Sequence, residues 1–152
     1  MQRPTASDRA ATRVVTVLSV SPHEEDHECL QSIFSHSKWK LCKASTLASA
    51  LAMLGEQEMP VILCERDLLP GTWRDMLAPI SDSPSRPLLL VSSRLADEQL
   101  WAEALNLGAY DVLAKPFDSR EVFRSVSLAW LHWKHCQDGA RAPAPMAVAC
   151  TA

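Results

Sequence analysis

Short strand-like runs alternate with segments of helical period along the chain. The strand-like runs occupy residues 14–18, 39–42, 61–64, 88–91 and 111–114. A helix-period segment follows each of them, at residues 21–34, 46–54, 72–77, 97–107 and 118–133. Five strand–helix units in succession predict an α/β fold, a doubly wound five-stranded parallel sheet with five helices on its two faces.

Several details of these helices are predicted from local patterns. Ser21 is expected as the N-cap of the first helix, with Pro22 at its first position and Glu24 at its third. The short helix 72–77 is expected to end at Ala78-Pro79. In the fourth helix the pattern places four apolar residues inward, namely Leu100, Trp101, Ala104 and Leu105.

The patterned part of the chain predicts one domain over residues 13–136. Residues 1–12 are polar, and residues 137–152 are rich in alanine and proline. Both segments have too little bulky apolar surface to offset the entropy of ordering, so we expect them to be disordered.

Composition excludes several classes of protein. The chain is 47% hydrophobic with a formal net charge of -3 and has no run of basic residues, so we expect no nucleic-acid partner. No stretch reaches the about 18–20 apolar residues that cross a bilayer, which predicts no membrane span. The five cysteines are scattered without a Cys-x-x-Cys pair, which indicates reduced thiols and a cytoplasmic protein.

Ligands of open parallel sheets bind beyond the carboxyl ends of the strands. Ser19, Glu65, Ser92 and Lys115 lie at four of these ends, so the pattern alone predicts a site among them.

The same residues carry a family resemblance. Lys115-Pro116-Phe117 follows the fifth strand, Ser92 ends the fourth, and Glu65 ends the third. In this order the motifs resemble those of a bacterial response-regulator receiver domain. The resemblance implies the flavodoxin-like strand order 2-1-3-4-5, a stand-alone, non-enzymatic role in two-component phosphorelay signalling, and Glu65 at the phosphoacceptor position.

The chain departs from the family at the metal site. Receivers carry two acidic residues at the end of the first strand that help to hold Mg²⁺, and here these positions are Ser19 and Val20. We expect residues 24–26 to lie too far along the chain to replace the pair. Glu65 is then the only anionic candidate, and we expect an atypical pseudo-receiver without a cofactor, Mg²⁺ included.

The acceptor and switch positions have competitors. Counting back from Pro70 by the usual family spacing leads to Arg66, but we favour Glu65 because it ends the apolar run; Asp67 is the competing acceptor. The family's switch aromatic lies three residues before the lysine, where this chain has Val112. Tyr110, two residues earlier, is the other switch candidate.

Two alternatives and the expected partners complete the interpretation. Residues 23–27 match His-Glu-x-x-His, so a metal-dependent hydrolase would use His23, Glu24 and His27. A receiver-fold scaffold unconnected to phosphorelay is the second alternative. Under the favoured hypothesis we expect a protein partner, a histidine kinase or another signalling protein, or a homodimer through the fourth and fifth helices.

Overall fold

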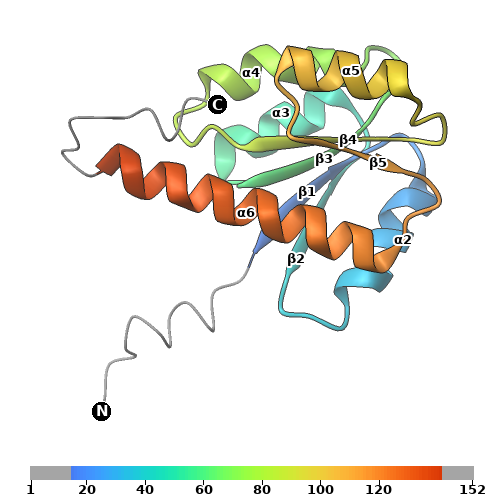
Figure 1. Cartoon of the computed structure of the whole chain (residues 1–152), viewed down its shortest axis with the longest axis horizontal. Helices are drawn as coiled ribbons and strands as arrows, with labels where there is room; N and C mark the ends of the chain where they lie inside the picture. Colours follow the sequence, from blue (N-terminus) through green and yellow to red (C-terminus); the bar gives the residue numbers. More distant parts are fainter. Residues whose placement is uncertain (1–14, 142–152) are drawn as a thin grey trace.

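A parallel sheet of five strands forms the centre of the molecule (Figure 1). The computed structural model describes residues 15–141. The strand order is β2-β1-β3-β4-β5, and each pairing is parallel, as predicted. The strands are β1 (Thr16–Val20), β2 (Lys40–Ala44), β3 (Val61–Glu65), β4 (Leu88–Ser93) and β5 (Asp111–Ala114).

Helices cover both faces of the sheet and complete the predicted doubly wound architecture (Figure 1). They are α2 (Glu24–Phe34), α3 (Leu47–Glu56), the 3₁₀ turn η1 (Trp73–Met76), α4 (Leu77–Asp82), α5 (Glu98–Leu107) and α6 (Ser119–Arg141). No helix within residues 15–141 is long and apolar enough to cross a membrane.

Two apolar clusters separate the layers. One packs α3, η1, α4 and α5 against one face, with Ala50 and Ala104 fully buried. The other packs α2 and α6 against the opposite face, with Phe34 and Val126 at its centre. Because side chains alternate along a strand, Val91 joins the first cluster while its neighbour Leu90 joins the second. The covered parts of both faces are therefore apolar, and Glu65 and Ser92 are buried polar residues at the carboxyl ends of their strands.

Helix α2 begins later than predicted. Its N-cap is His23, which makes no side-chain capping hydrogen bond. The Ser21 hydroxyl instead accepts from the backbone N–H of His23 at 3.1 Å and donates to Asp26. The prediction of Ser21 as the N-cap was therefore wrong, because the serine is used within the loop that precedes the helix.

Pro79 does not end the short helix after η1. It lies at the third position of α4, where a backbone N–H has no partner within the helix, so proline is tolerated there.

The prediction for α5 was half right. Leu100 and Ala104 are buried, whereas Trp101 and Leu105 are 40% and 46% exposed, because only a narrow stripe of this helix meets the sheet.

The last helix is longer than predicted. Helix α6 continues to Arg141, beyond the domain boundary that we expected after residue 136. The remaining segments expected to be disordered, residues 1–12 and 142–152, lie outside the described residues.

Candidate functional site

Three of the four carboxyl-end residues named from the sequence, Glu65, Ser92 and Lys115, meet at one edge of the sheet. Glu65 is the last residue of β3 and lies opposite Ser92 of β4. Lys115 follows β5 directly, and its backbone N–H donates to the Ser93 carbonyl at 3.0 Å. Its peptide bond to the exposed Pro116 is cis. The strand ends thus aim the Glu65, Ser92 and Lys115 side chains at one point.

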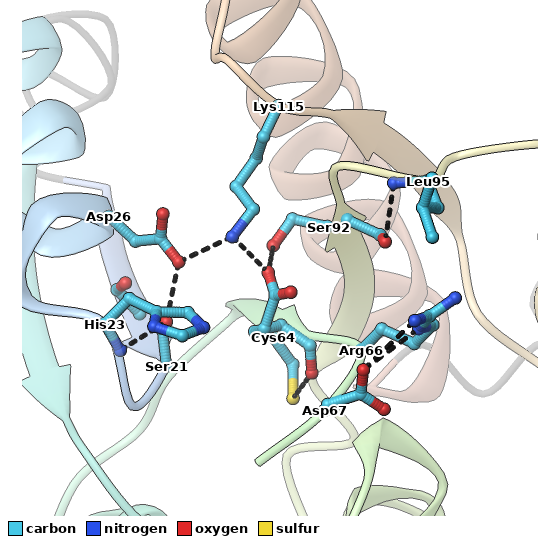
Figure 2. Close-up of polar contacts among 12 residues, drawn as sticks. Ser21, His23, Asp26, Cys64, Arg66, Asp67, Ser92, Leu95 and Lys115 are labelled. Carbon is cyan, nitrogen blue, oxygen red and sulfur yellow. Dashed lines mark hydrogen bonds and ion pairs between the residues drawn. The ribbon is translucent and has the colours of Figure 1, made fainter.

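Lys115 lies between two carboxylates. Its Nζ is 2.9 Å from Oδ2 of Asp26 (Figure 2). The same Nζ is 2.7 Å from Oε2 of Glu65. The side chains of Lys115, Asp26 and Glu65 are only 6%, 8% and 9% exposed, respectively. Burial disfavours the ammonium, but hydrogen bonds and charge attraction to Glu65 and Asp26 outweigh it, so the pKa of Lys115 is raised. The site therefore holds a charged lysine shared by two acids.

Ser92 completes the contacts of Glu65. Its hydroxyl donates to Oε2 of Glu65 at 3.2 Å, the same oxygen that contacts Lys115. Glu65 thus bridges β3 to β4 and to the residue after β5, and the other Glu65 oxygen has no such partner among these residues. The extra methylene of glutamate, compared with aspartate, lets a strand-end carboxylate span this gap.

Asp26 is the site residue that the sequence analysis missed. It comes from the first turn of α2, is 6% exposed, and accepts a hydrogen bond from the Ser21 hydroxyl at 2.7 Å. The expectation that residues 24–26 lie too far away was wrong for Asp26, and Glu65 is not the only anion at the site. The helical spacing already indicated this burial. Asp26, Leu30 and Phe34 follow one another at intervals of four residues, so they lie on the same buried face of the helix.

Ser19 and Val20 do not reach Lys115. The Val20 side chain is fully buried in the apolar core. The Ser19 hydroxyl is 2.9 Å from Nδ1 of His27, and Nε2 of His27 donates to the Ser21 carbonyl at 2.9 Å. This buried histidine fixes the loop between β1 and α2, which in turn carries Ser21 to Asp26.

The His-Glu-x-x-His pattern does not form a zinc site. Both ring nitrogens of His27 have hydrogen-bond partners inside the protein, and His23 is exposed at the helix start. Zinc binding would require a free nitrogen on each of these histidines. Within residues 15–141 no three histidine, cysteine or acidic residues are grouped so as to hold a metal ion. The hydrolase alternative is not favoured.

Asp67, the competing acceptor, lies apart from Lys115. Its Oδ2 is 3.1 Å from the Arg66 guanidinium, and its side chain is 50% exposed (Figure 2). Its backbone forms an isolated bridge with Thr72, which fixes the loop after β3. Of the two acceptor candidates, only Glu65 is in contact with both Ser92 and Lys115.

The two switch-region candidates also lie outside the charged cluster. Val112 is 2% exposed within the core. Tyr110 precedes β5 at the opposite end of that strand, and its backbone N–H donates to the Leu89 carbonyl at 2.7 Å. Burial, followed by the charge of Asp111, raises the pKa of the tyrosine. The Ser92 hydroxyl is directed to Glu65.

Comparison with known proteins identifies the family. The model of the response regulator receiver domain matches residues 17–127, well over half of the chain. The signal receiver domain of an HD domain-containing protein from Pseudomonas fluorescens Pf-5 is 26% identical, with a TM-score of 0.73 over 81% of this chain and 91% of that one. The comparison with curated proteins found no match.

Two further solved structures share the fold. A two-component response regulator from Clostridium difficile is 16% identical, with a TM-score of 0.69 over 76% of this chain and 94% of that one. The beryllofluoride-activated NtrC4 receiver domain dimer is 22% identical, with a TM-score of 0.72 over 78% of this chain and 98% of that one. This chain belongs to the response regulator receiver domain family of two-component signal transduction.

Proposed function

We propose that this receiver domain is an atypical one, held in a single state by its own carboxylates instead of by phosphorylation. The observation that carries the proposal is the contact of one buried ammonium, Lys115, with both Glu65 and Asp26. Glu65 occupies the phosphoacceptor position, at the end of β3 and opposite Ser92. A permanent carboxylate there fixes the strand ends without a transferred group.

The charges at the site support this proposal. A phosphorylated side chain carries about −1.5 to −2 charges at neutral pH. Glu65 and Asp26 together bring two carboxylates to Lys115, at 2.7 and 2.9 Å. The lysine is thus already paired with the amount of negative charge that a phosphoryl group brings. Adding a phosphoryl group to Glu65 would place further negative charge beside Asp26 in a buried site.

The donor set does not suit Mg²⁺, and we include the lack of a metal in the proposal. Mg²⁺ requires oxygen ligands in near-octahedral geometry. At the end of β1 this chain offers Ser19, which is engaged with His27, and Val20, which has no donor. The nearest carboxylate oxygens of Glu65 and Asp26 already face an ammonium, whose charge repels a cation.

The output of the domain is a protein–protein contact in the cytoplasm, with a histidine kinase or another signalling protein as partner and no catalysis of its own. A homodimer through α5 and α6 is the second arrangement in this proposal. Large apolar side chains are exposed on these two helices, namely Trp101, Leu105, Leu107, Leu128 and Leu131. Exposed apolar side chains in such number are typical of an interaction surface.

The test is incubation with acetyl phosphate, with and without Mg²⁺, followed by intact-mass measurement. We expect no phosphoryl adduct in either condition, whereas a receiver with the intact acidic pair, treated in parallel, gains one. The matched variants are E65D, which shortens the carboxylate, and D67A, which removes the exposed acid. Mg²⁺-dependent phosphorylation of Glu65 or Asp67 in the unaltered chain would show that the domain is a working phosphorelay receiver.

A further inference from the structure

A groove lies at the opposite end of β4 and β5 from the charged site. Its volume is about 930 Å³, within the range of roughly 300–1,000 Å³ that is usual for small-molecule sites, and it is open to solvent. Leu88, the first residue of β4, and Tyr110, which immediately precedes β5, both line it. The other lining residues belong to α4, the loop that follows α4, the end of α5 with the turn after it, and the C-terminal half of α6. The groove is therefore separate from the site of Glu65 and Lys115.

The loop after α4 forms one wall of the groove, and contacts with α6 hold its shape. The Trp133 indole N–H and the Gln137 amide both donate to the Ser85 carbonyl, each at 2.7 Å. The backbone N–H of Arg86 donates to the Ser83 carbonyl at 3.1 Å. Arg86 has a φ of 45°, a left-handed conformation that residues other than glycine rarely adopt. Because α6 holds the residue before it, Arg86 keeps this conformation and a fixed place in the wall.

Arg86 brings a permanent positive charge to the groove. None of the described lining residues is acidic, and the ion pairs of the described chain do not include Arg86. Tyr110 and His132 add a hydroxyl and an imidazole, and their ring centroids are 5.6 Å apart. A guanidinium with further hydrogen-bond donors nearby favours an anion, and the planar fork of arginine matches the two oxygens of a carboxylate.

The rest of the lining is mostly apolar. The apolar lining residues besides the tyrosine are Ile80, Pro84, Pro87, Leu88, Leu105, Ala109 and Trp133. An inorganic anion would leave these side chains in water, whereas an apolar or aromatic body covers them. A single arginine also matches the one charge of a carboxylate better than the about −1.5 to −2 charges of a phosphoryl group. The lining therefore selects a ligand with one carboxylate and an apolar body.

We propose that the groove binds a small aromatic carboxylate, with the carboxylate at Arg86 and the ring against Tyr110 and Trp133. Apolar and aromatic walls with a few placed polar groups are the usual form of small-molecule sites. Leu105 lines the groove and is also one of the exposed apolar side chains of α5. A bound ligand thus covers part of the surface that is proposed above for protein contact.

The experiment is a ¹H–¹⁵N NMR titration of the full chain with three probes that share an indole ring, namely indole-3-propionate, its neutral amide and the cation tryptamine. We expect indole-3-propionate to shift the Trp133 indole signal and the Tyr110 amide signal. The amide signals of Ser92 and Lys115 should stay in place. The neutral amide should bind at least about fivefold more weakly, because it lacks the charged acceptor, and tryptamine should not shift the groove signals. No shift with the acid at about 10 mM, where a site with a Kd of about 1 mM is nearly filled, would overturn the proposal.

Matched variants test the role of the charge. Arg86 is exposed, so R86Q removes the charge without disturbing the core, and it should weaken binding of indole-3-propionate at least about fivefold. R94Q, at an exposed arginine directly after β4, is the control and should bind like the unaltered chain. Equal binding of the three probes, or an unchanged affinity in R86Q, would show an apolar surface that does not recognise a carboxylate.

A second copy of the chain is the other possible occupant, and the same spectra distinguish it. Groove signals that move with protein concentration before any probe is added would show contact between copies and would contradict a small-molecule site. We expect these signals to be independent of protein concentration. None of these outcomes depends on whether Glu65 accepts a phosphoryl group.

Discussion

The carboxyl and amino ends of β4 and β5 differ in their exposure to solvent and in how their polar groups are paired. At the carboxyl end, an ammonium and two carboxylates are less than 10% exposed, and each charge has a partner within 3 Å. At the amino end, a groove lined by residues of α4, α5 and α6 is open to solvent, and the partly buried Ser85 carbonyl accepts two hydrogen bonds from α6. The closed end depends on complete pairing of its charges, because water does not replace a lost partner there. The open end tolerates the loss of a hydrogen-bond partner better, because water can replace that partner.

This difference bears on the proposed function of the domain. A closed, fully paired cluster is suited to holding one arrangement of the strand ends, which agrees with a receiver that needs no phosphoryl group. The same comparison predicts that substitutions of similar size have unequal costs at the two ends.

The largest effect is expected for K115M. The substitution leaves Glu65 and Asp26 buried without their shared ammonium, and removal of one member of a buried ion pair costs about 3–5 kcal/mol. The measurement is the free energy of unfolding in urea. K43M, at an exposed lysine on β2, is the control and should change stability by less than about 0.5 kcal/mol. A loss below about 1 kcal/mol for K115M would mean that the closed end does not depend on its charge pairing.

The raised pKa of Lys115 also predicts how the stability lost in K115M depends on pH. This pH-dependent part cannot exceed the whole loss of stability. A lysine whose folded pKa lies above its usual 10.5 stabilises the protein fully below that value, and the contribution is lost as pH rises through the folded pKa. The difference in unfolding free energy between the unaltered chain and K115M should therefore be constant at neutral pH and decrease above pH 10.5. A difference that instead increases at alkaline pH would contradict the pairing.

The fold could be predicted from the sequence because local patterns of apolar and polar residues indicate its strands and helices. The alternation of apolar runs with helix-period segments requires only neighbouring residues, and the parallel order follows from repeated strand–helix units. Glu65, Ser92 and Lys115 could be named for the same reason, since each directly follows or ends a predicted strand. Parallel strands bring their carboxyl ends to one edge, so the site followed from the fold.

Asp26 was missed because its burial depends on a distant residue. An acid in the first turn of a helix is usually exposed, where it interacts favourably with the helix dipole. Its burial here requires Lys115, which is far along the chain and joins it only in the folded protein. Trp101 was misplaced for a related reason. Periodicity shows that a helix has an apolar stripe, but not how much of the stripe the sheet covers.

The smallest effect is expected at the open end, for W133F and Q137A. Each substitution removes one of the two hydrogen bonds to the Ser85 carbonyl, and the lost bond should cost about 1 kcal/mol, the usual net value. In W133F the smaller ring adds a loss of packing, because Trp133 is only 8% exposed. Because Ser85 is only partly buried, water reaches its carbonyl in the double variant, and the two costs should add to within about 0.5 kcal/mol. Urea unfolding of the four proteins measures the coupling. A double variant less stable than the sum by about 1 kcal/mol or more would show a carbonyl left without a partner, and the amino end would then resemble the closed end in its energetics.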